Sequence, residues 1–272
     1  MSEGQARRIA VGSGGKRRDV AVIRREGAAP GLFWLGGFRS DMTGTKAVAI
    51  DRLGASLGLA VTRFDYSGHG VSGGRFEDGT ISHWLEDARA VFDAETDGPQ
   101  VLVGSSMGGW ISLLLARAEL ARAGRANSRI KGMVLIAPAP DFTEDLMWAR
   151  LPETARAEIL STGRHLLGSP YSPEPTPITR GLIEDGRKHL LLSGMIETGC
   201  PIHILQGRQD VDVPWSHAER LIERLASDDV ILTYVRDGDH RLSRPEDIDL
   251  LAQAVTRMVA RCGLTTTLLS GR

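Results

Sequence analysis

Ser106 lies in the pattern G-x-S-x-G, formed with Gly104 and Gly108, which is typical of a serine that acts as a nucleophile. An apolar run precedes the pattern, and a helical pattern that begins near Trp110 follows it. A serine on a sharp strand-to-helix turn projects its hydroxyl above the sheet, and small residues two positions away on each side keep the two arms apart. Ser105 lacks glycines at both of those positions. The pattern therefore predicts that Ser106 is the nucleophile.

A serine hydroxyl attacks efficiently only when a base takes its proton, and a carboxylate orients that base. When the serine is carried by a strand-to-helix turn, an acid and then a histidine follow it along the chain. His240 comes shortly after the apolar run 230–235, so its ring can reach Ser106 over the end of a sheet. We therefore interpret His240 as the base. His217 follows Pro214 in a helical pattern, where we expect a solvated surface position.

The acid is expected after the strand that precedes this histidine. Asp210 follows the apolar run 202–205 and lies in the turn before a helical pattern. A carboxylate there can accept the second ring N–H of His240 and hold the imidazole in the correct orientation. Asp212 is the alternative acid, although helix capping is the expected role of an aspartate at that position. The position in the turn favours Asp210.

Attack by a serine places negative charge on the substrate oxygen, and backbone N–H groups usually bind that charge. One donor is expected from Met107, the residue after the nucleophile. The other is expected from the glycine-containing loop 36–41, which follows the apolar run 31–35, and Phe38 is the candidate there. The sequence therefore predicts an oxyanion hole formed by Phe38 and Met107.

Short apolar runs alternate with helical patterns along the chain, which is typical of a mostly parallel central sheet flanked by helices, the α/β class. The expected strands are 31–35, 60–64, 101–103, 132–136, 202–205 and 230–235, and the expected helices are 45–57, 81–96, 108–121, 215–226 and 245–259. Further strand patterns near Ile9 and at 20–23 flank the glycine-rich run 12–16. We interpret this run as a hairpin turn, because a phosphate-binding loop would need glycine where Ala10 stands.

Residues 141–199 interrupt this alternation. They carry no strand pattern, are rich in proline, and show helical patterns at 153–160 and 178–192. A connection of this length is usually functional. We therefore predict a helical lid at 141–199, inserted into a core domain formed by residues 1–140 and 200–272.

Large apolar side chains in this segment are expected to pack the lid onto the core, and some of them to line an acyl pocket, because a lid that excludes water needs apolar walls. These residues are Met147, Trp148, Leu166, Leu167, Tyr171, Met195 and Ile196. We predict Met147 and Trp148 as substrate-pocket residues, and Arg164 with His165 as candidates to bind an anionic leaving group. His69, which follows another strand at the same edge of the sheet, is expected to brace a loop.

Composition excludes several classes of protein. A chain of 272 residues with 42% hydrophobic and 25% charged residues is ordinary for a globular domain. The net charge of −1 argues against nucleic acid or an acidic membrane as the main partner, and no apolar run approaches the ~20 residues of a membrane span. Cys200 and Cys262 lack metal-ligand spacing, so we expect neither a metal site nor a disulfide framework. The N-terminus lacks the apolar stretch of a secretory signal, which favours a cytoplasmic location.

Several stretches along the chain carry a resemblance to a known family. They are Gly44-Thr45-Lys46-Ala47, Arg63-Phe64-Asp65-Tyr66-Ser67-Gly68, Gly98-Pro99-Gln100, Gly108-Gly109-Trp110, Cys200-Pro201-Ile202, Val213-Pro214-Trp215 and Asp239-His240-Arg241. Together with the turn at Ser106, they resemble the α/β-hydrolase superfamily and, within it, the mitochondrial palmitoyl-protein thioesterases that also hydrolyse acyl glucuronides. The resemblance covers most of the chain apart from residues 141–199, and Gln206 stands where that family often has histidine.

The resemblance implies a cofactor-independent serine esterase or thioesterase of the α/β-hydrolase fold, with Ser106, Asp210 and His240 as its triad and Phe38 and Met107 at the oxyanion positions. The expected reaction forms an acyl-enzyme from a small-molecule or lipidated acyl substrate, in a monomer or homodimer. Because lids set substrate choice, the resemblance implies the reaction class better than the substrate. Peptidase, peroxidase and carbon–carbon hydrolase activities use the same triad, and a non-catalytic protein that binds a small acyl ligand is the alternative from another class.

Overall fold

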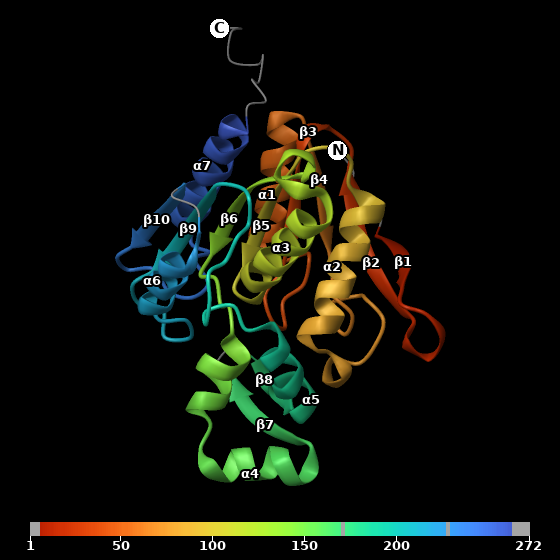
Figure 1. Cartoon of the computed structure of the whole chain (residues 1–272), viewed down its shortest axis with the longest axis vertical. Helices are drawn as coiled ribbons and strands as arrows, with labels where there is room; N and C mark the ends of the chain where they lie inside the picture. The colour runs from red at the N-terminus through yellow and green to blue at the C-terminus, as the bar shows by residue number, and fades with distance from the viewer. Residues whose placement is uncertain (1–5, 170–171, 227–228, 263–272) are drawn as a thin grey trace, which may run out of the picture.

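The computed structural model describes residues 6–169, 172–226 and 229–262. Its centre is an eight-stranded sheet with the strand order β1-β2-β4-β3-β5-β6-β9-β10 (Figure 1). β2 runs antiparallel to its neighbours β1 and β4, and the other neighbouring pairs are parallel. The strands are β1 (Arg7–Val11), β2 (Arg18–Arg25), β3 (Ala28–Leu35), β4 (Leu59–Phe64), β5 (Gln100–Ser105), β6 (Ile130–Ile136), β9 (Ile202–Gly207) and β10 (Val230–Val235). The predicted α/β fold with a mostly parallel sheet is confirmed, as is the hairpin at the N-terminus.

Helices cover both faces of this sheet. They are α1 (Thr45–Leu57), α2 (Ile81–Glu95), α3 (Met107–Asn127), α6 (Trp215–Arg224) and α7 (Pro245–Arg261). Successive side chains of a strand point to opposite faces. In β3, Phe33 packs on the face covered by α2, α3 and α6, and Trp34 packs on the face covered by α1 and α7. Burial on both faces explains why each central strand is a continuous apolar run in the sequence.

The carboxyl ends of the parallel strands meet at one edge of the sheet, where ligands bind in open α/β folds. The loops that follow β3, β4, β5, β9 and β10 all start from this edge. The insertion between β6 and β9 also lies beyond it, at the bottom of Figure 1. No helix among the described residues is long and apolar enough to cross a membrane.

The insertion is not wholly helical. A short helical run after Thr143 leads to α4 (Glu153–Thr162), which confirms the helix predicted there. An antiparallel hairpin of β7 (Arg164–Ser169) and β8 (Ser172–Thr179) follows, and then α5 (Arg180–Gly186). The expectation that this segment contains no strand is therefore wrong.

β8 is a strand in spite of its prolines. Pro175 and Pro177 are two residues apart, so the positions of their missing N–H groups face the same edge of the strand. Among the described strands β8 pairs with β7 alone, with Leu167 opposite Thr176 and Leu166 opposite Pro177. Its outer edge needs no donors, and alternate prolines are therefore compatible with pairing on the inner edge.

Candidate active site

Ser106 connects β5 to α3 on a sharp turn. Its backbone adopts φ 53° and ψ −116°, a conformation that is rare for a residue with a side chain and costs about 1–3 kcal/mol. The flanking glycines are required because the arms of the turn touch their surroundings. A Cβ at Gly104 would lie 2.5 Å from the carbonyl oxygen of Gly108, and a Cβ at Gly108 would lie 2.0 Å from the carbonyl oxygen of Leu35.

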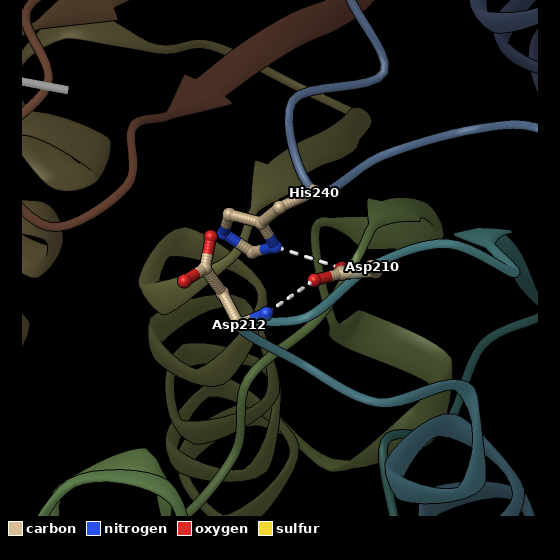
Figure 2. Close-up of side chains that lie close together, drawn as sticks. All are labelled: Asp210, Asp212 and His240. Atoms are coloured by element: carbon tan, nitrogen blue, oxygen red, sulfur yellow. Dashed lines mark hydrogen bonds and ion pairs between the residues drawn. The ribbon is translucent and has the colours of Figure 1, made fainter. Parts of the chain in front are cut away.

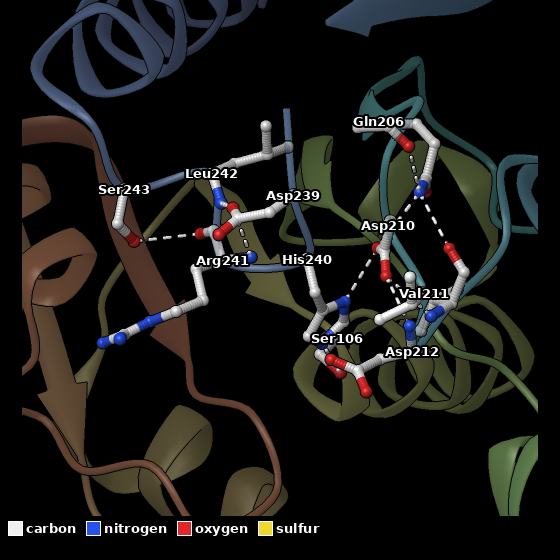
Figure 3. A network of polar contacts seen from close by, with 12 residues as sticks. Ser106, Gln206, Asp210, Val211, Asp212, Asp239, His240, Arg241, Leu242 and Ser243 are labelled. Carbon is white, nitrogen blue, oxygen red and sulfur yellow. Dashed lines mark hydrogen bonds and ion pairs between the residues drawn. The ribbon is translucent and has the colours of Figure 1, made fainter. Parts of the chain in front are cut away.

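Ser106, His240 and Asp210 form a continuous hydrogen-bonded chain (Figure 3). His240 follows β10 and Asp210 follows β9, so the two loops bring both side chains to the edge where Ser106 lies. His240 Nε2 lies 3.1 Å from Ser106 Oγ, and His240 Nδ1 lies 2.8 Å from Asp210 Oδ2. Because a carboxylate only accepts, the proton of the neutral ring lies on Nδ1, and Nε2 can accept the proton of the Ser106 hydroxyl.

The carboxylate of Asp210 is held on all sides. Its side chain is fully buried, and its Oδ1 accepts the backbone N–H groups of Asp212 at 3.0 Å and Val213 at 2.8 Å. Its Oδ2 also accepts Gln206 Nε2 at 3.2 Å, and the same amide donates to the Val213 carbonyl at 3.0 Å. Gln206 therefore connects the end of β9 to the loop that carries Asp210.

Asp212, the alternative acid, occupies a different place. Its carboxylate lies beside the ring of His240, and the ligand atoms of Asp210, Asp212 and His240 are all within 4.8 Å of one another (Figure 2). Carboxylates and imidazole are ligand types that cations accept. Here the ring nitrogen and three further donors already bind the oxygens of Asp210. With these donors in place, the Asp210 oxygens are not available to a cation. Because Asp210 is the carboxylate that accepts from His240, Asp210 and not Asp212 lies in line with His240 and Ser106.

Phe38 lies on a turn beside Ser106. In residues 37–40, the N–H and the hydroxyl of Ser40 donate to the Gly37 carbonyl at 3.1 and 2.8 Å. A Cβ at Gly37 would lie only 3.5 Å from the Cβ of Ser106. No described residue accepts a hydrogen bond from the Phe38 N–H, and Met107, as the first residue of α3, has no acceptor within the helix. Both predicted oxyanion donors are thus next to Ser106.

A cavity of about 660 Å³ includes Ser106 and His240 in its wall. Its apolar lining residues include Phe38, Phe142, Leu146, Met147 and Leu167, and its charged ones include Arg39, Asp41, Lys46, Arg150, Asp212 and Arg241. Met147 therefore lies where the sequence predicts a pocket residue, and Leu167 brings the hairpin into the same wall. The cavity lies between the sheet edge and the insertion.

Two predicted pocket residues lie elsewhere. Trp148 and Arg164 are not among the residues that line the cavity. The Trp148 ring instead faces the guanidinium groups of Arg156 at 5.7 Å and Arg187 at 5.1 Å. Arg164 begins β7, has an exposed side chain and lies 4.0 Å from a carboxylate oxygen of Glu77. Trp148 packs between two guanidinium groups before α4 and Arg164 pairs with Glu77 at the start of β7, so neither side chain lines this cavity.

The other large apolar residues of the insertion have different environments. Leu167 lines the cavity and Ile196 is buried in the core, as expected, whereas Leu166 and Met195 are largely exposed. Tyr171 lies outside the described residues. His165 does not line the cavity either, so it does not support an anion-binding role there.

Two cationic residues that line the cavity, Arg39 and Lys46, are not predicted as site residues from the sequence. Arg39 Nη1 donates to Thr176 Oγ1 of β8 at 2.7 Å, and therefore links the loop after β3 to the insertion. Lys46 donates to the carbonyl of Arg241, next to His240. Burial and the charge of Arg241 lower the pKa of Lys46 to about 8. Lys46 lies in one of the stretches that carry the family resemblance, which is the one signal that pointed to it.

His217 is buried, in contrast to the solvated position expected for it. It lies on the same face of α6 as Ala218 and Leu221, one turn further along, and that face packs against the sheet. Its Nε2 lies 2.7 Å from the carbonyl oxygen of Pro140. His217 is therefore a structural histidine and does not compete with His240.

His69 contacts a loop, as predicted, and lies inside the protein. Its ring is packed edge-on against Tyr66, Phe76 and Trp84, with ring centroids 5.8, 5.2 and 5.3 Å away. Burial, with a smaller contribution from the charge of Arg39, lowers the pKa of His69 to about 4. The folded protein therefore holds this ring in its neutral form at physiological pH.

This burial predicts a loss of stability in acid. Between an ordinary histidine pKa of about 6.5 and the value of about 4 for His69, the unfolded chain binds a proton that the folded chain does not. The free energy of unfolding should therefore fall as the pH is lowered through that window, by about 3 kcal/mol for this residue. Urea denaturation of the wild type and of His69→Gln at pH 6.5 and pH 4.5 measures it. An equal loss in both proteins would contradict the assignment.

Comparison with known proteins agrees with this geometry. A family model described as serine aminopeptidase, S33, matches residues 37–170. Over 242 residues the chain is 35% identical to the mitochondrial palmitoyl-protein thioesterase ABHD10 of Homo sapiens, which covers 89% of this chain and 76% of that protein. The same relationship is found for the protein of that name from Mus musculus, with 35% identity and 79% of its length covered.

Solved structures give the same result. The crystal structure of a hydrolase from Agrobacterium vitis S4 matches this one with a TM-score of 0.90. The two sequences are 54% identical, and the match covers 94% of this chain and 98% of that one. The mouse α/β hydrolase domain-containing protein 10 is 32% identical with a TM-score of 0.83, and 95% and 99% of the two chains are covered. The family resemblance seen in the sequence is thus confirmed, and the chain is a hydrolase of the ester and thioester class. It belongs to the α/β-hydrolase family that contains the palmitoyl-protein thioesterase ABHD10.

Proposed function

We propose that this hydrolase cleaves a carboxylic ester or thioester through an acyl-enzyme on Ser106. The observation that carries the proposal is the unbroken hydrogen-bonded chain from Ser106 through His240 to Asp210, with separations of 3.1 and 2.8 Å. His240 takes the proton of the serine hydroxyl as the oxygen attacks, and later gives it to the leaving alcohol or thiol. Asp210 orients the imidazole and stabilises its charged form.

Two backbone donors bind the oxyanion in this mechanism. The N–H groups of Phe38 and Met107 flank Ser106, and neither has an acceptor among the described residues that would compete with a substrate oxygen. The amino end of α3 adds the positive end of a helix dipole at the same place. Preorganised donors of this kind stabilise the tetrahedral intermediate more than the planar substrate, which lowers the barrier. Water then hydrolyses the acyl-enzyme by the same steps.

Residues 141–199 act as a lid in this proposal. Phe142, Leu146, Met147 and Leu167 place an apolar surface over the nucleophile, which suits the acyl part of a substrate. The relatives are named palmitoyl-protein thioesterases. The apolar lining of the cavity suits the acyl chain of a lipidated protein and that of a small-molecule acyl substrate alike. The cavity also has charged lining residues, among them Arg39, Lys46 and Arg241, which suit a polar leaving group.

The substrate, the cellular location and the oligomeric state are further proposals. The triad also serves peptidases, which is relevant because the matching family model is described as a serine aminopeptidase. Parallel assays with p-nitrophenyl esters, acyl-CoA, acyl glucuronides and aminoacyl amides decide between these substrates. A cytoplasmic location remains a prediction beside relatives named mitochondrial, and fractionation of the native host tests it. A monomer or homodimer is expected, which light scattering distinguishes.

Intact-mass analysis after exposure to a fluorophosphonate tests the proposed function. We expect one adduct on the wild type and none on Ser106→Ala, because only an activated serine displaces fluoride at a useful rate. Circular dichroism of both proteins verifies that the variant is folded. A folded wild type that gains no mass and turns over none of the esters would favour the non-catalytic ligand-binding protein.

A further inference from the structure

We propose that His69 is the positioning residue of the oxyanion hole: its neutral ring, protonated on Nδ1, holds the turn that presents the Phe38 N–H to the substrate oxygen. The inference rests on the proposed function, since only a reaction that passes through an oxyanion needs this turn to be held. His69 does not touch the nucleophile, and its effect acts entirely through residues 37–40.

The two partners of the ring determine its tautomer. His69 Nε2 lies 3.1 Å from the backbone nitrogen of Arg39, and His69 Nδ1 lies 3.2 Å from the carbonyl oxygen of Ser67. A backbone N–H only donates and a carbonyl only accepts, so Nε2 must carry the lone pair and Nδ1 the proton. Either the other tautomer or the charged ring would turn Nε2 into a donor facing a donor, and the contact with Arg39 would be lost.

The turn needs this contact because its backbone is strained. Arg39 is the third residue of the turn and has φ 59°, in the left-handed region that favours glycine or asparagine. The hydrogen bond from its N–H to His69 fixes the peptide between Phe38 and Arg39. On the other side of Phe38, the N–H and hydroxyl of Ser40 fix the Gly37 carbonyl, and so fix the direction of the Phe38 N–H in the same peptide. Loss of the His69 acceptor would release one of these two anchors.

The ring is itself immobilised. It is 4% exposed and lies among three aromatic rings. Asp65 connects the loop after β3, which contains Arg39, to the loop after β4, which contains His69. Its carboxylate accepts the N–H of Met42 at 2.7 Å and that of Val71 at 2.9 Å. A side chain at Gly70 would collide with the same carboxylate, at 2.1 Å. The segment 65–72 thus functions as a rigid support for one acceptor atom.

The test compares His69→Phe, which removes the acceptor, with His69→Gln, whose amide oxygen can reach the position of Nε2. Loss of one oxyanion donor lowers kcat by about 10²–10³-fold in serine hydrolases, and displacement of a donor should cost part of that. We expect kcat for a p-nitrophenyl ester to fall about 10- to 100-fold in His69→Phe with KM within about threefold, and affinity for a trifluoromethyl ketone to fall by the same factor as kcat. His69→Gln should recover most of the loss.

His203→Phe is the matched control, because His203 is equally buried and makes one side-chain hydrogen bond, to Thr233 at 2.9 Å, at the far end of the sheet. It should lower stability without a selective change in kcat. On unaltered protein with ¹⁵N-labelled histidine, two-bond NMR spectra should show His69 neutral and protonated on Nδ1 at pH 7 and at pH 5.

The outcomes separate this inference from the proposed function. Wild-type protein that forms no fluorophosphonate adduct and hydrolyses no ester would overturn the proposed function and the inference with it. Normal turnover by the wild type together with unchanged kcat in folded His69→Phe would overturn the inference alone. An Nε2-protonated or charged His69 ring in the wild type would also overturn it, even if no variant folds.

Discussion

Replacement of Ser106 by alanine is expected to lower kcat for any ester substrate by about 10⁵–10⁶-fold. The reason lies in the turn: Ser106 Oγ lies 3.1 Å from His240 Nε2, and Ser106 is next to the two proposed oxyanion donors. Alanine retains the Cβ that packs against Gly37, so KM should change only a few-fold. Stopped-flow and steady-state assays with p-nitrophenyl esters of several chain lengths measure both quantities.

The matched control is Ser105→Ala, one residue earlier in the same turn. Ser105 is buried whereas Ser106 is half-buried, and it ends β5 with ordinary strand geometry instead of the strained conformation of Ser106. Its removal should change kcat less than about tenfold, the range of an indirect packing effect. Turnover by Ser106→Ala above about 1% of the wild type would mean that another group is the nucleophile.

Asp210→Asn should lower kcat by about 10⁴-fold with little loss of structure. The backbone N–H groups of Asp212 and Val213 both donate to Oδ1, so the amide oxygen of asparagine must take that place. The amide nitrogen then faces His240 Nδ1, where Oδ2 lies in the wild type. A donor at Nδ1 forces the ring proton onto Nε2, and Nε2 can no longer accept the proton of Ser106.

Asp212→Asn is the control for this assignment. It removes the charge of a carboxylate beside the same ring but leaves the contact between His240 and Asp210 in place. We expect less than about a tenfold change in kcat. If Asp212→Asn proves far more damaging than Asp210→Asn, the acid has been misassigned. The pH profile of kcat/KM in both variants shows whether the base still titrates normally.

Most of the core could be predicted from the sequence because its signals are local. The apolar runs of β5 and β9 and the glycines around Ser106 each follow from backbone geometry within a few residues. The chain order of nucleophile, acid and base then left few candidates. Position within one loop favours Asp210 over Asp212, and the 2.8 Å contact between Asp210 and His240 agrees with this prediction.

The features that the sequence does not predict depend on contacts between distant parts of the chain. The β7–β8 hairpin carries proline at alternate positions, a pattern that is compatible with pairing only where one edge is left open, and the sequence does not say which edge that is. The sequence predicts Arg164 as a pocket residue, whereas the arginine from the loop after β3, Arg39, lines the cavity. The bond between the Arg39 N–H and His69 joins residues 30 positions apart, and no periodicity signals such a pair.

The contact between Arg39 Nη1 and Thr176 makes Arg39 a bridge between two parts of the protein, the turn at residues 37–40 and the insertion. Its backbone belongs to the oxyanion turn, and its side chain is bound by the hairpin of the insertion. An insertion transplanted from a relative to change substrate preference would therefore also replace the hydrogen-bond acceptor of Arg39. Chimaeras of this hydrolase should be designed with positions 39 and 176 exchanged as a pair.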